Sequence, residues 1–526
     1  MTSPGSRIPA QSADEDASGS VAAQAFREGM RALFAARGEE RAVQFDGVWW
    51  SWRDLAILGV RLGEQLADAP AGPVALVLRN RPSGVGALLG LLDLGRTTFL
   101  ISPVQPPAAM SADVARCGVV AVLADADDWS PELAAVSWGV ELGSADGALT
   151  ATRRPGDRAK AALPGVTGPR GAAVVIPTSG TTGPPKRIPL AWGDLPVPRV
   201  RPAGAVVINA LSSVTITGLS VVLRSLCGGR PLALLERLDI PGWVALVREH
   251  RPTYIGLPPA AMRMLLASDI DPSDLSSIQA WPTGSAPVPA SLQEEFEARF
   301  GIAVLHNYGA TEFGGTVSGW TPEEHREWAH RKRGSVGRAR PGIALRIVDQ
   351  ESGAVMAVDE IGLLEVRSPS APQRKNEWIR TNDLARMDAD GFLYIQGRID
   401  DVIVRGGFKV QLSEVEEILS AHPAVSAAAA VGLPEARLGQ VPAAAVTLVA
   451  SADAPSEQEL KDWVRGQAAP YKVPVLVQVV DALPQTHSYK VNRPALRELL
   501  EPLLVAGPRA SAAPPEQPSA VGGETG

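Results

Sequence analysis

A short segment rich in hydroxyl groups and glycines carries the strongest chemical signal in this chain. It reads PTSGTTGPPKRIPL from Pro177 to Leu190, directly after the predicted strand AAVVI. Glycines allow a backbone to wrap closely around phosphate oxygens, hydroxyl and N–H groups donate hydrogen bonds to them, and Lys186 supplies positive charge. The GxxxxGKS/T pattern of a Walker A loop is absent from this segment. The segment therefore indicates either a phosphate-binding loop of another kind or an ordinary polar turn.

A second segment combines an aromatic ring, a hydroxyl group and a carboxylate within a few residues. It reads HNYGATEFGG from His306 to Gly315. Tyr308 offers an aromatic face and Thr311 a hydroxyl group. Glu312 supplies a carboxylate that could hold Mg²⁺, a hard cation with a preference for oxygen ligands. The alternative is a surface loop in which Glu312 is simply hydrated.

Two later segments contribute a carboxylate, a guanidinium and a lysine. WIRTNDLARMDADGFLYIQGRIDDVIVRGGFKV runs from Trp378 to Val410. Its Asp383 could accept hydrogen bonds from both hydroxyls of a ribose, and its Arg398 could reach the same nucleotide. LPQTHSYKVNR, from Leu483 to Arg493, places Lys490 near the end of the folded chain. A single lysine at such a position is most often a surface charge.

The elements that must position these residues follow an alternating pattern. The predicted strands are Val74 to Arg79, Thr97 to Ser102, Val119 to Asp125, Ala205 to Leu211 and Thr253 to Pro258. The predicted helices between them are Pro82 to Leu94, Ile216 to Cys227 and Ala290 to Phe300. This alternation favours an α/β fold with doubly wound layers around parallel strands.

The pattern changes after about Arg340, where short strands follow one another. From Asp400 onward the chain is typical of a small α+β unit, because VIVRGGFKV predicts two strands around a Gly-Gly turn. We expect a large domain over residues 21–399 and a small one over 400–505. The ends, 1–20 and 506–526, hold few large apolar side chains and are expected to be unstructured.

Two helix starts are predicted within the small domain. Ser413 with Glu416 and Ser456 with Glu459 both have the spacing of a capping box, in which each side chain bonds the other residue's backbone N–H. Each pair therefore predicts the first turn of a helix.

Composition limits the classes of partner. The chain has 526 residues, 45% of them hydrophobic, and its 50 basic and 57 acidic side chains give a net charge of −7. The lack of a basic excess argues against a nucleic-acid partner. The stretch from Gly84 to Val104 carries Asp93 and Arg96 near its centre, too costly for a membrane span. Cys117 and Cys227, the only cysteines, suit a reducing compartment. We expect a cytoplasmic protein.

In combination, the four segments resemble the adenylate-forming superfamily. That family includes acyl-CoA synthetases, the adenylation domains of peptide synthetases and firefly luciferase. The resemblance rests on SGTTG-x-PK, YGATE and the TxDL…GRIDD block, and it runs from about Val43 to Leu500. It implies a large AMP-binding domain followed by a small mobile C-terminal domain.

The resemblance also implies a two-step reaction. A carboxylate first attacks the α-phosphate of ATP carried with Mg²⁺, which gives acyl-AMP and pyrophosphate. An acceptor, most often the thiol of coenzyme A, then displaces AMP. Because the first step joins two anions, the site must neutralise charge and align the reactants.

The motifs assign nucleotide contacts by resemblance. The residues implied to hold the β- and γ-phosphates are Thr178, Ser179, Gly180, Thr181, Thr182, Gly183 and Lys186. Thr311 would contact the α-phosphate and Glu312 the magnesium ion. The residues implied around adenine are Tyr308 with Asn307 and Gly309 on one side, and Gly284, Ser285 and Ala286 along the other edge. The residues implied at the ribose are Asp383, Ile395 and Arg398.

The resemblance gives Lys490 the central catalytic role. It would bridge the oxygens of the carboxylate and the α-phosphate during adenylation only. The small domain would then rotate about Asp400, withdraw this lysine and present the VRGGFKV loop for the second step.

The chain departs from the family pattern at four places. Asn382 replaces the glycine of the usual TGD, although Asp383 is kept. Tyr489 replaces the glycine that commonly precedes the catalytic lysine, and Gln411-Leu412 stands where a proline is common. Val214-Thr215 replaces an aromatic-His pair at the mouth of the acyl pocket. The second and third departures concern the acceptor step, and the fourth removes a bulky gate.

We expect the acid-binding pocket to be lined by small and largely uncharged residues. The residues implied to line it are Thr215, Thr217, Val221, Thr283, His306, Gly309 and Gly314. Such a lining favours a fatty or aromatic acid over a charged amino acid.

Three hypotheses follow. The first is an ATP-dependent acid–CoA ligase. The second keeps adenylation but passes the acyl group to an amine or to the thiol of a carrier protein. The third is a non-catalytic binding protein with the same fold. His325 and His330, at five-residue spacing, indicate a solvated charged helix rather than a metal site.

Overall fold

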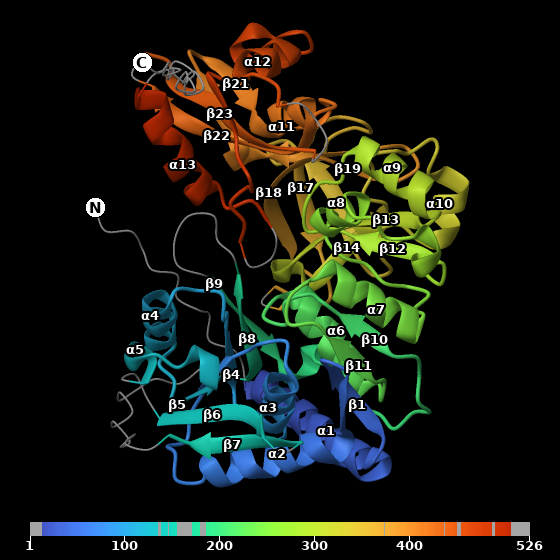
Figure 1. Cartoon of the computed structure of the whole chain (residues 1–526), viewed down its shortest axis with the longest axis vertical. Helices are drawn as coiled ribbons and strands as arrows, with labels where there is room; N and C mark the ends of the chain where they lie inside the picture. Colours follow the sequence, from blue (N-terminus) through green and yellow to red (C-terminus); the bar gives the residue numbers. More distant parts are fainter. Residues whose placement is uncertain are drawn as a thin grey trace, which may run out of the picture. The chain divides into compact units, whose positions relative to one another are not determined.

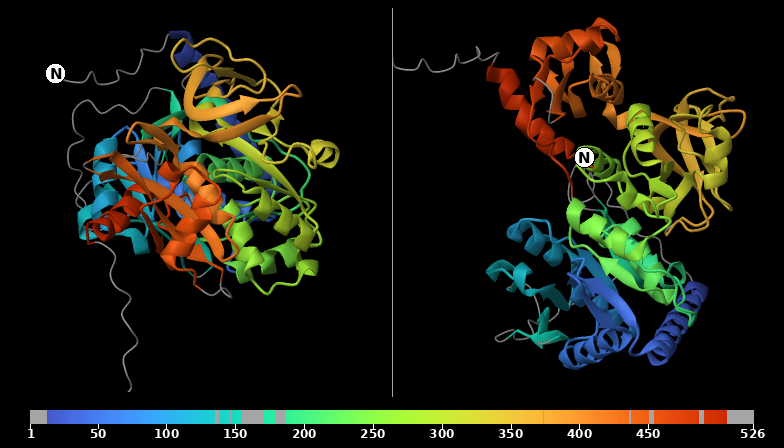
Figure 2. Two further views of the ribbon diagram at one scale, coloured as in Figure 1. Left: turned by 90° about the horizontal axis from the view of Figure 1, so that it is seen from above. Right: turned by 45° about the vertical axis from the view of Figure 1, so that its right-hand side comes forward.

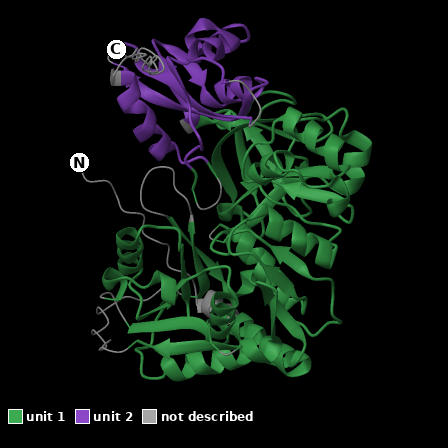
Figure 3. Cartoon of the chain, viewed as in Figure 1, with its two compact units in different colours: residues 1–399, 485–490 green, residues 400–484, 491–526 purple. Residues whose placement is uncertain are grey.

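The computed structural model describes residues 13–134, 138–145, 147–154, 171–178, 186–372, 374–435, 437–449, 454–486 and 490–506 (Figure 1). The chain divides into two compact units. Unit 1 consists of residues 1–399 with 485–490, and unit 2 of residues 400–484 with 491–526 (Figure 3). The segment that ends in Lys490 therefore groups with unit 1 rather than with the rest of the expected domain 400–505. Because residues 485–490 group with unit 1 while the residues on either side of them group with unit 2, one boundary at Asp400 does not divide the chain into its two units.

The N-terminal expectation needs correction. Helix α1 (Ala13–Arg37) makes residues 13–20 helical, although they were expected to be unstructured. Helix formation is cooperative once a helix has started, and this helix is anchored further along by Phe26, Met30 and Leu33, which are buried in the core of unit 1. At the other end, α13 (Arg493–Ala506) includes Ala506, which was expected to begin the tail.

Unit 1 contains a seven-stranded sheet with the strand order β7-β6-β5-β3-β4-β8-β9. Its strands are β3 (Val74–Val77), β4 (Thr98–Ile101), β5 (Ala121–Asp125), β6 (Trp138–Ala145), β7 (Ala148–Arg153), β8 (Ala172–Thr178) and β9 (Lys186–Ala191). The helices around it are α2 (Trp52–Gln65), α3 (Pro82–Asp93), α4 (Pro107–Cys117) and α5 (Pro131–Ala134). The strands are parallel apart from the two edge strands β7 and β9.

The central strand β3 shows that this sheet is covered on both faces. Val74 and Leu76 pack into a core shared with α1, α2 and α3, whereas Ala75 and Val77 pack into a second core with α4 and α5. Figure 2 gives two further views of the ribbon. Successive strand residues point to opposite faces, so a fully apolar run requires helices on both sides. The predicted doubly wound α/β fold is confirmed.

Two more sheets extend unit 1. The first has the order β10-β11-β1-β2, with strands β1 (Arg41–Phe45), β2 (Val48–Ser51), β10 (Val207–Asn209) and β11 (Leu232–Leu234). The second has the order β12-β13-β14-β15, with strands β12 (Ala280–Thr283), β13 (Ala303–Ala310), β14 (Gly315–Gly319) and β15 (Arg338–Ala339). Their helices are α6 (Ile216–Cys227), α7 (Ile240–His250), α8 (Pro259–Leu266), α9 (Ala290–Phe300) and α10 (Pro322–Trp328).

The strand predicted from Thr253 to Pro258 does not form. Tyr254 makes only an isolated bridge to Ala280. The prolines at 252, 258 and 259 bracket this run, and proline cannot donate to a strand ladder. The predicted helices α6 and α9 have the expected bounds.

An antiparallel sheet in the order β16-β17-β18-β19 completes unit 1. Its strands are β16 (Ala344–Val348), β17 (Gly362–Arg367), β18 (Trp378–Met387) and β19 (Leu393–Arg398). β18 and β19 are joined by the predicted Asp390-Gly391 turn, where Gly391 has φ +80°. The short 3-10 helices of the chain are η1 (Ala126–Asp128), η2 (Trp192–Asp194), η3 (Pro272–Leu275), η4 (Thr311–Phe313), η5 (Ile399–Asp401) and η6 (Pro470–Lys472).

Unit 2 is an α+β unit around one sheet. Its strands are β20 (Val402–Arg405), β21 (Phe408–Gln411), β22 (Val425–Glu435), β23 (Gly439–Leu448) and β24 (Leu476–Val479), with helices α11 (Leu412–Ser420), α12 (Glu457–Arg465) and α13. β20 and β21 form the predicted hairpin around Gly406-Gly407, both with positive φ. The predicted fold of a large α/β domain and a small α+β domain is confirmed.

The two predicted helix starts in unit 2 have different outcomes. Ser456 and Glu459 form the predicted capping box at α12. Ser413 and Glu416 do not, because the N-cap of α11 is Gln411, two residues before Ser413, and Glu416 instead accepts a hydrogen bond from the Ala430 N–H at 2.8 Å. A contact distant in sequence has replaced the local one. Over the described ranges, no helix is long and apolar enough to cross a membrane.

Candidate active site

The β13–η4–β14 hairpin carries the YGATE motif. Tyr308 and Gly309 lie near the end of β13, and Thr311 and Glu312 lie in η4. A side chain at Gly309 would collide with the carbonyl oxygen of Gly315, so only glycine allows β13 and β14 to approach this closely. Gly314 has φ +81° and lies against the backbone of Ser370. These glycines fix the hairpin turn that presents Glu312 to solvent.

Strand β18 brings a carboxylate to the end of this hairpin. The hydroxyl group of Tyr308 donates a hydrogen bond to Asp383, and Arg398, opposite Asp383 in the β18–β19 register, lies 3.6 Å away. Burial raises the pKa of Tyr308, and the Asp383 carboxylate raises it further. Phenol, carboxylate and guanidinium therefore meet at one place, although YGATE and TxDL are far apart in the sequence.

Thr381 holds the backbone of Asp383 in place through its side-chain hydroxyl group. Its hydroxyl oxygen accepts a hydrogen bond from the Asp383 N–H at 3.0 Å and donates to the Leu364 carbonyl at 2.9 Å. Thr381 is buried, and its hydroxyl links β17 to the backbone of β18 at Asp383. Sequence reasoning noted Thr381 only as a part of the TxD motif. Its position two residues before a functional aspartate, the spacing of a local hydroxyl–backbone bond, was the available signal.

Lys490 lies in the electrostatic field of the same residues. Desolvation by the surrounding protein lowers the pKa of its ammonium group, the carboxylates of Glu312 and Asp383 raise it, and Arg398 lowers it. As a residue Lys490 is exposed, so the desolvation concerns its ammonium end. Unit 1 thus gathers a lysine, an arginine and two carboxylates from four separate segments.

The carboxylate of Glu312 fits a magnesium ion that arrives with ATP. It is exposed, at the tip of the hairpin. Mg²⁺ is commonly held by one or two carboxylates together with substrate phosphates rather than by a complete protein cage. The described part of the chain contains no group of three or more histidine, cysteine, aspartate or glutamate side chains that could hold a metal ion.

The expected adenine edge lies after β12. A side chain at Gly284 would lie 2.6 Å from the carbonyl oxygen of Asn307, and Ser285 has the uncommon φ of 69°. Asn307 accepts a hydrogen bond from Arg340 at 3.3 Å, a contact that sequence reasoning missed because nothing local marks that arginine. The backbone of Ala286 forms a hydrogen bond with the His306 side chain. The two expected adenine segments therefore lie side by side.

Two of the residues expected to line the acid-binding pocket already form hydrogen bonds within the protein. The Thr283 hydroxyl donates to the Leu257 carbonyl at 2.9 Å. Thr215 caps α6, because its hydroxyl accepts from the Gly218 N–H at 3.2 Å and donates to the Ser212 carbonyl at 2.8 Å. Both hydroxyl groups are thus already bonded.

The other two expected lining residues on α6 differ from each other. Val221 packs against the core of unit 1, whereas Thr217 is exposed. Ile395, expected at the ribose, packs against the same apolar cluster as Tyr308.

The phosphate-binding segment is described only at its ends. Thr178 closes β8 and is paired in register with Lys186, which opens β9. The side chain of Thr178 and the residues Ser179, Gly180, Thr181, Thr182 and Gly183 lie outside the described part of the structure. Tyr489, the departure beside Lys490, also lies outside it, as does the side chain of Asp400.

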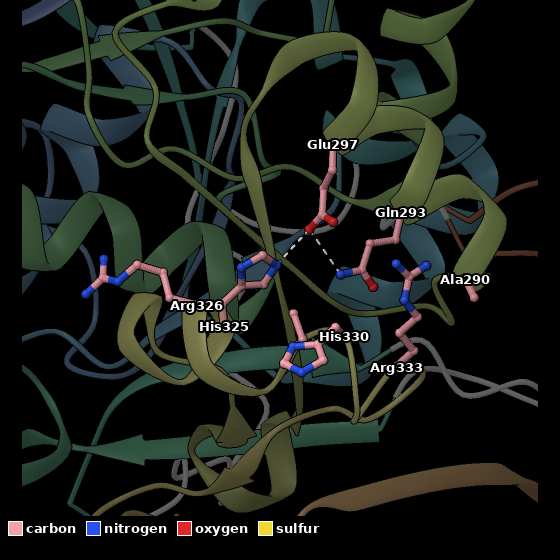
Figure 4. Close-up of a pocket in the computed structure, with 8 residues that line it drawn as sticks. Ala290, Gln293, Glu297, His325, Arg326, His330 and Arg333 are labelled. Atoms are coloured by element: carbon pink, nitrogen blue, oxygen red, sulfur yellow. Dashed lines mark hydrogen bonds and ion pairs between the residues drawn. The ribbon is translucent and has the colours of Figure 1, made fainter.

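A polar pocket of about 290 Å³ between α9 and α10 contains none of these residues (Figure 4). At its floor, Glu297 accepts hydrogen bonds from His325 at 2.8 Å, Gln293 at 3.1 Å and the Val304 N–H at 2.9 Å. Its arginines are paired with glutamates outside the lining. His325 therefore serves as a structural link between helices, not as the solvated side chain that was expected.

His306 is buried, and burial lowers its pKa to about 4. The unfolded chain takes up this proton near pH 6.5, before the folded protein does. Folding stability should therefore rise with pH between about 4 and 6.5, with a total contribution of about 3 kcal/mol.

His306→Gln tests this pH dependence. Urea unfolding of both proteins at a series of pH values should show a flatter rise in the free energy of unfolding for His306→Gln. Equal slopes for the two proteins would contradict a neutral, buried imidazole.

Comparison with known proteins places this arrangement in a family. Residues 31–372 match the family model described as AMP-binding enzyme, and residues 414–490 match the AMP-binding enzyme C-terminal domain. The 4-coumarate–CoA ligase-like 5 of Oryza sativa subsp. japonica is 29% identical over 466 residues, which are 83% of this chain and 81% of the rice protein. Indoleacetate–CoA ligase of Aromatoleum aromaticum (strain DSM 19018 / LMG 30748 / EbN1) is 30% identical over 354 residues, 63% of this chain and 68% of that protein.

Solved structures agree on the fold. The o-succinylbenzoate CoA synthetase MenE of Bacillus subtilis, in complex with the acyl-adenylate intermediate OSB-AMP, aligns with a TM-score of 0.72 at 24% identity. The alignment covers 89% of this chain and 97% of that one. An ATP-bound RpMatB-BxBclM chimera aligns with a TM-score of 0.75 at 25% identity, over 91% of this chain and 99% of that one. With both of its domains matched by family models, the chain belongs to the AMP-binding enzyme family, within the adenylate-forming superfamily.

Proposed function

We propose that this protein is an AMP-forming acid–CoA ligase. It joins a carboxylic acid to ATP as acyl-AMP with release of pyrophosphate, and then transfers the acyl group to the thiol of coenzyme A. The observation that carries the proposal is the convergence of Lys490, Glu312, Asp383 and Arg398 within unit 1. Similar proteins named as CoA ligases support the second step.

The residues divide the work of adenylation. Asp383, held by Thr381 and Tyr308, binds the ribose hydroxyls and orients the nucleotide. A magnesium ion held by Glu312 would neutralise phosphate charge. The carboxylate oxygen attacks the α-phosphorus, the bond to the β-phosphate oxygen breaks, and pyrophosphate leaves. Lys490 donates hydrogen bonds to both reacting anions, and Thr311 to the α-phosphate, so negative charge is balanced where it develops.

The acid is fatty or aromatic. With the hydroxyls of Thr215 and Thr283 already bonded within the protein, the expected pocket offers methyl groups and glycine backbone rather than free polar groups. Burial keeps His306 neutral at physiological pH. A site of this kind selects an acid with an apolar body. We place the reaction in the cytoplasm, where ATP and coenzyme A are available.

The acceptor step has one alternative. Tyr489 and Gln411-Leu412 depart from the family pattern on the acceptor side, which supports transfer to an amine or to a carrier-protein thiol as a second candidate. A ring beside Lys490 would narrow the path by which the acceptor reaches acyl-AMP.

The proposed function is tested by measuring pyrophosphate release with ATP and a panel of aliphatic and aromatic acids, each with and without coenzyme A. Mass spectrometry identifies the products. We expect acyl-CoA and AMP with an apolar acid. Acyl-AMP that accumulates regardless of coenzyme A would favour an amine or carrier-protein acceptor. No acid-dependent pyrophosphate release with any acid would contradict the proposal.

A further inference from the structure

Unit 2 contains a partly buried charge cluster that the proposed reaction does not use directly. Arg493, the first residue of α13, lies 2.9 Å from Glu416 and 3.1 Å from Asp401. It also donates a hydrogen bond to the carbonyl of Ala430 on β22. Side-chain exposures of 18% to 23% show that the three charged groups are largely shielded. Arg493 thus connects three separate segments of unit 2.

Two residues of the cluster are close in sequence to positions that matter for the proposed reaction. Asp401 directly follows Asp400, the expected hinge, and Arg493 follows Lys490 by three residues. A direct ion pair therefore joins the chain just after the hinge to the chain just after the proposed catalytic lysine.

A backbone hydrogen bond closes the base of the loop that carries Lys490. The Asn492 N–H donates to the Pro484 carbonyl at 2.8 Å, which joins the two ends of the loop. The Asn492 side chain accepts from the Ala495 N–H at 3.2 Å and caps α13. Leu496 and Leu500 of the same helix are fully buried in the core of unit 2. The loop therefore extends from a rigid base, and Arg493 ties that base to Asp401.

We propose that the Asp401–Arg493 ion pair is a positioning element that couples the hinge to Lys490, so that both move as one rigid body. This inference rests on the proposed function. Without the ion pair, the base of the lysine loop would keep its contacts to Glu416 and β22 but lose its direct connection to the hinge. Lys490 would then reach the reacting oxygens less accurately, and a displacement of about 1 Å can cost about 100-fold in rate.

Asp401→Asn tests the coupling with little risk to folding, because the Glu416–Arg493 contact remains. We expect acid-dependent pyrophosphate release to fall about 10- to 100-fold in kcat. The KM values for ATP and acid should stay within about 3-fold, because Lys490 acts mainly on the charge that develops in the transition state. Transfer from supplied acyl-AMP to coenzyme A should also stay within about 3-fold, since this step does not need Lys490. The matched control is Asp462→Asn, which removes an exposed ion pair with Arg465 in the same unit and should leave all rates unchanged.

A double variant separates positioning from general damage. In a Lys490→Ala background, Asp401→Asn should cause no further loss of adenylation, because the ion pair acts through the lysine. A further loss there, equal loss of both half-reactions, or behaviour like Asp462→Asn would overturn the inference. If the unmodified protein releases no pyrophosphate with any acid, the proposed function fails instead.

Discussion

Lys490→Ala should reduce acid-dependent pyrophosphate release by about 1,000-fold or more, while transfer from supplied acyl-AMP to coenzyme A continues. The lysine lies in the field of Glu312, Asp383 and Arg398, where the first step brings two anions together. Removing a preorganised donor from such a transition state typically costs 100- to 1,000-fold, and here a full positive charge is lost as well. The transfer step starts from acyl-AMP and does not need this charge.

Two comparisons sharpen the Lys490 experiment. Lys461→Ala removes a lysine of unit 2 that pairs with Glu457 at 2.7 Å, and it should retain the unmodified rate. Because desolvation lowers the pKa of Lys490, adenylation should decline with rising pH before an ordinary lysine would lose its proton. Equal loss of both half-reactions in Lys490→Ala would refute the assignment.

Asp383→Ala should lower kcat/KM for ATP by about 100-fold or more, mainly through a higher KM. Hydrogen bonds to a charged group contribute about 1.5–3 kcal/mol each, and the ribose would lose two of them. The loss also leaves the half-buried Tyr308 hydroxyl and Arg398 without this carboxylate. Steady-state kinetics with varied ATP, at saturating acid, measure the effect.

A carboxylate elsewhere in the same sheet system provides the control for Asp383. Asp359 pairs with Arg386 at 2.6 Å and is exposed, so Asp359→Asn should leave the KM for ATP unchanged. Tyr308→Phe should cause a smaller loss than Asp383→Ala, since the carboxylate would remain. An Asp383→Ala protein with an unchanged KM for ATP would contradict the ribose role.

Local patterns predicted the elements well where the local interaction is also the strongest one available. The helices Ile216–Cys227 and Ala290–Phe300 and the capping box of Ser456 with Glu459 formed as predicted. Glu416 shows the opposite case. Its spacing from Ser413 was correct for a capping box, but Arg493 and the Ala430 N–H, both distant in sequence, offered stronger partners.

The lysine-bearing segment shows a second limit of local reasoning. The sequence marked a domain change near Asp400, but not that residues 485–490 would group with unit 1 while their neighbours stay in unit 2. Which unit a loop contacts depends on surfaces formed elsewhere in the chain. Likewise, nothing local indicated that the Thr283 hydroxyl would donate to the distant Leu257 carbonyl. Thr215, in contrast, directly precedes the predicted helix Ile216–Cys227, which is the position of a helix N-cap.

The sequence by itself determined the family and the kind of chemistry, because each motif is a short run whose residues are neighbours in any fold. It also determined the alternation of strands and helices, which follows from the periodicity of apolar side chains. Only the tertiary structure decided that Tyr308 meets Asp383 and that Lys490 lies in the field of Glu312. Those pairs are far apart along the chain, and their meeting depends on how whole sheets pack, which no local pattern encodes.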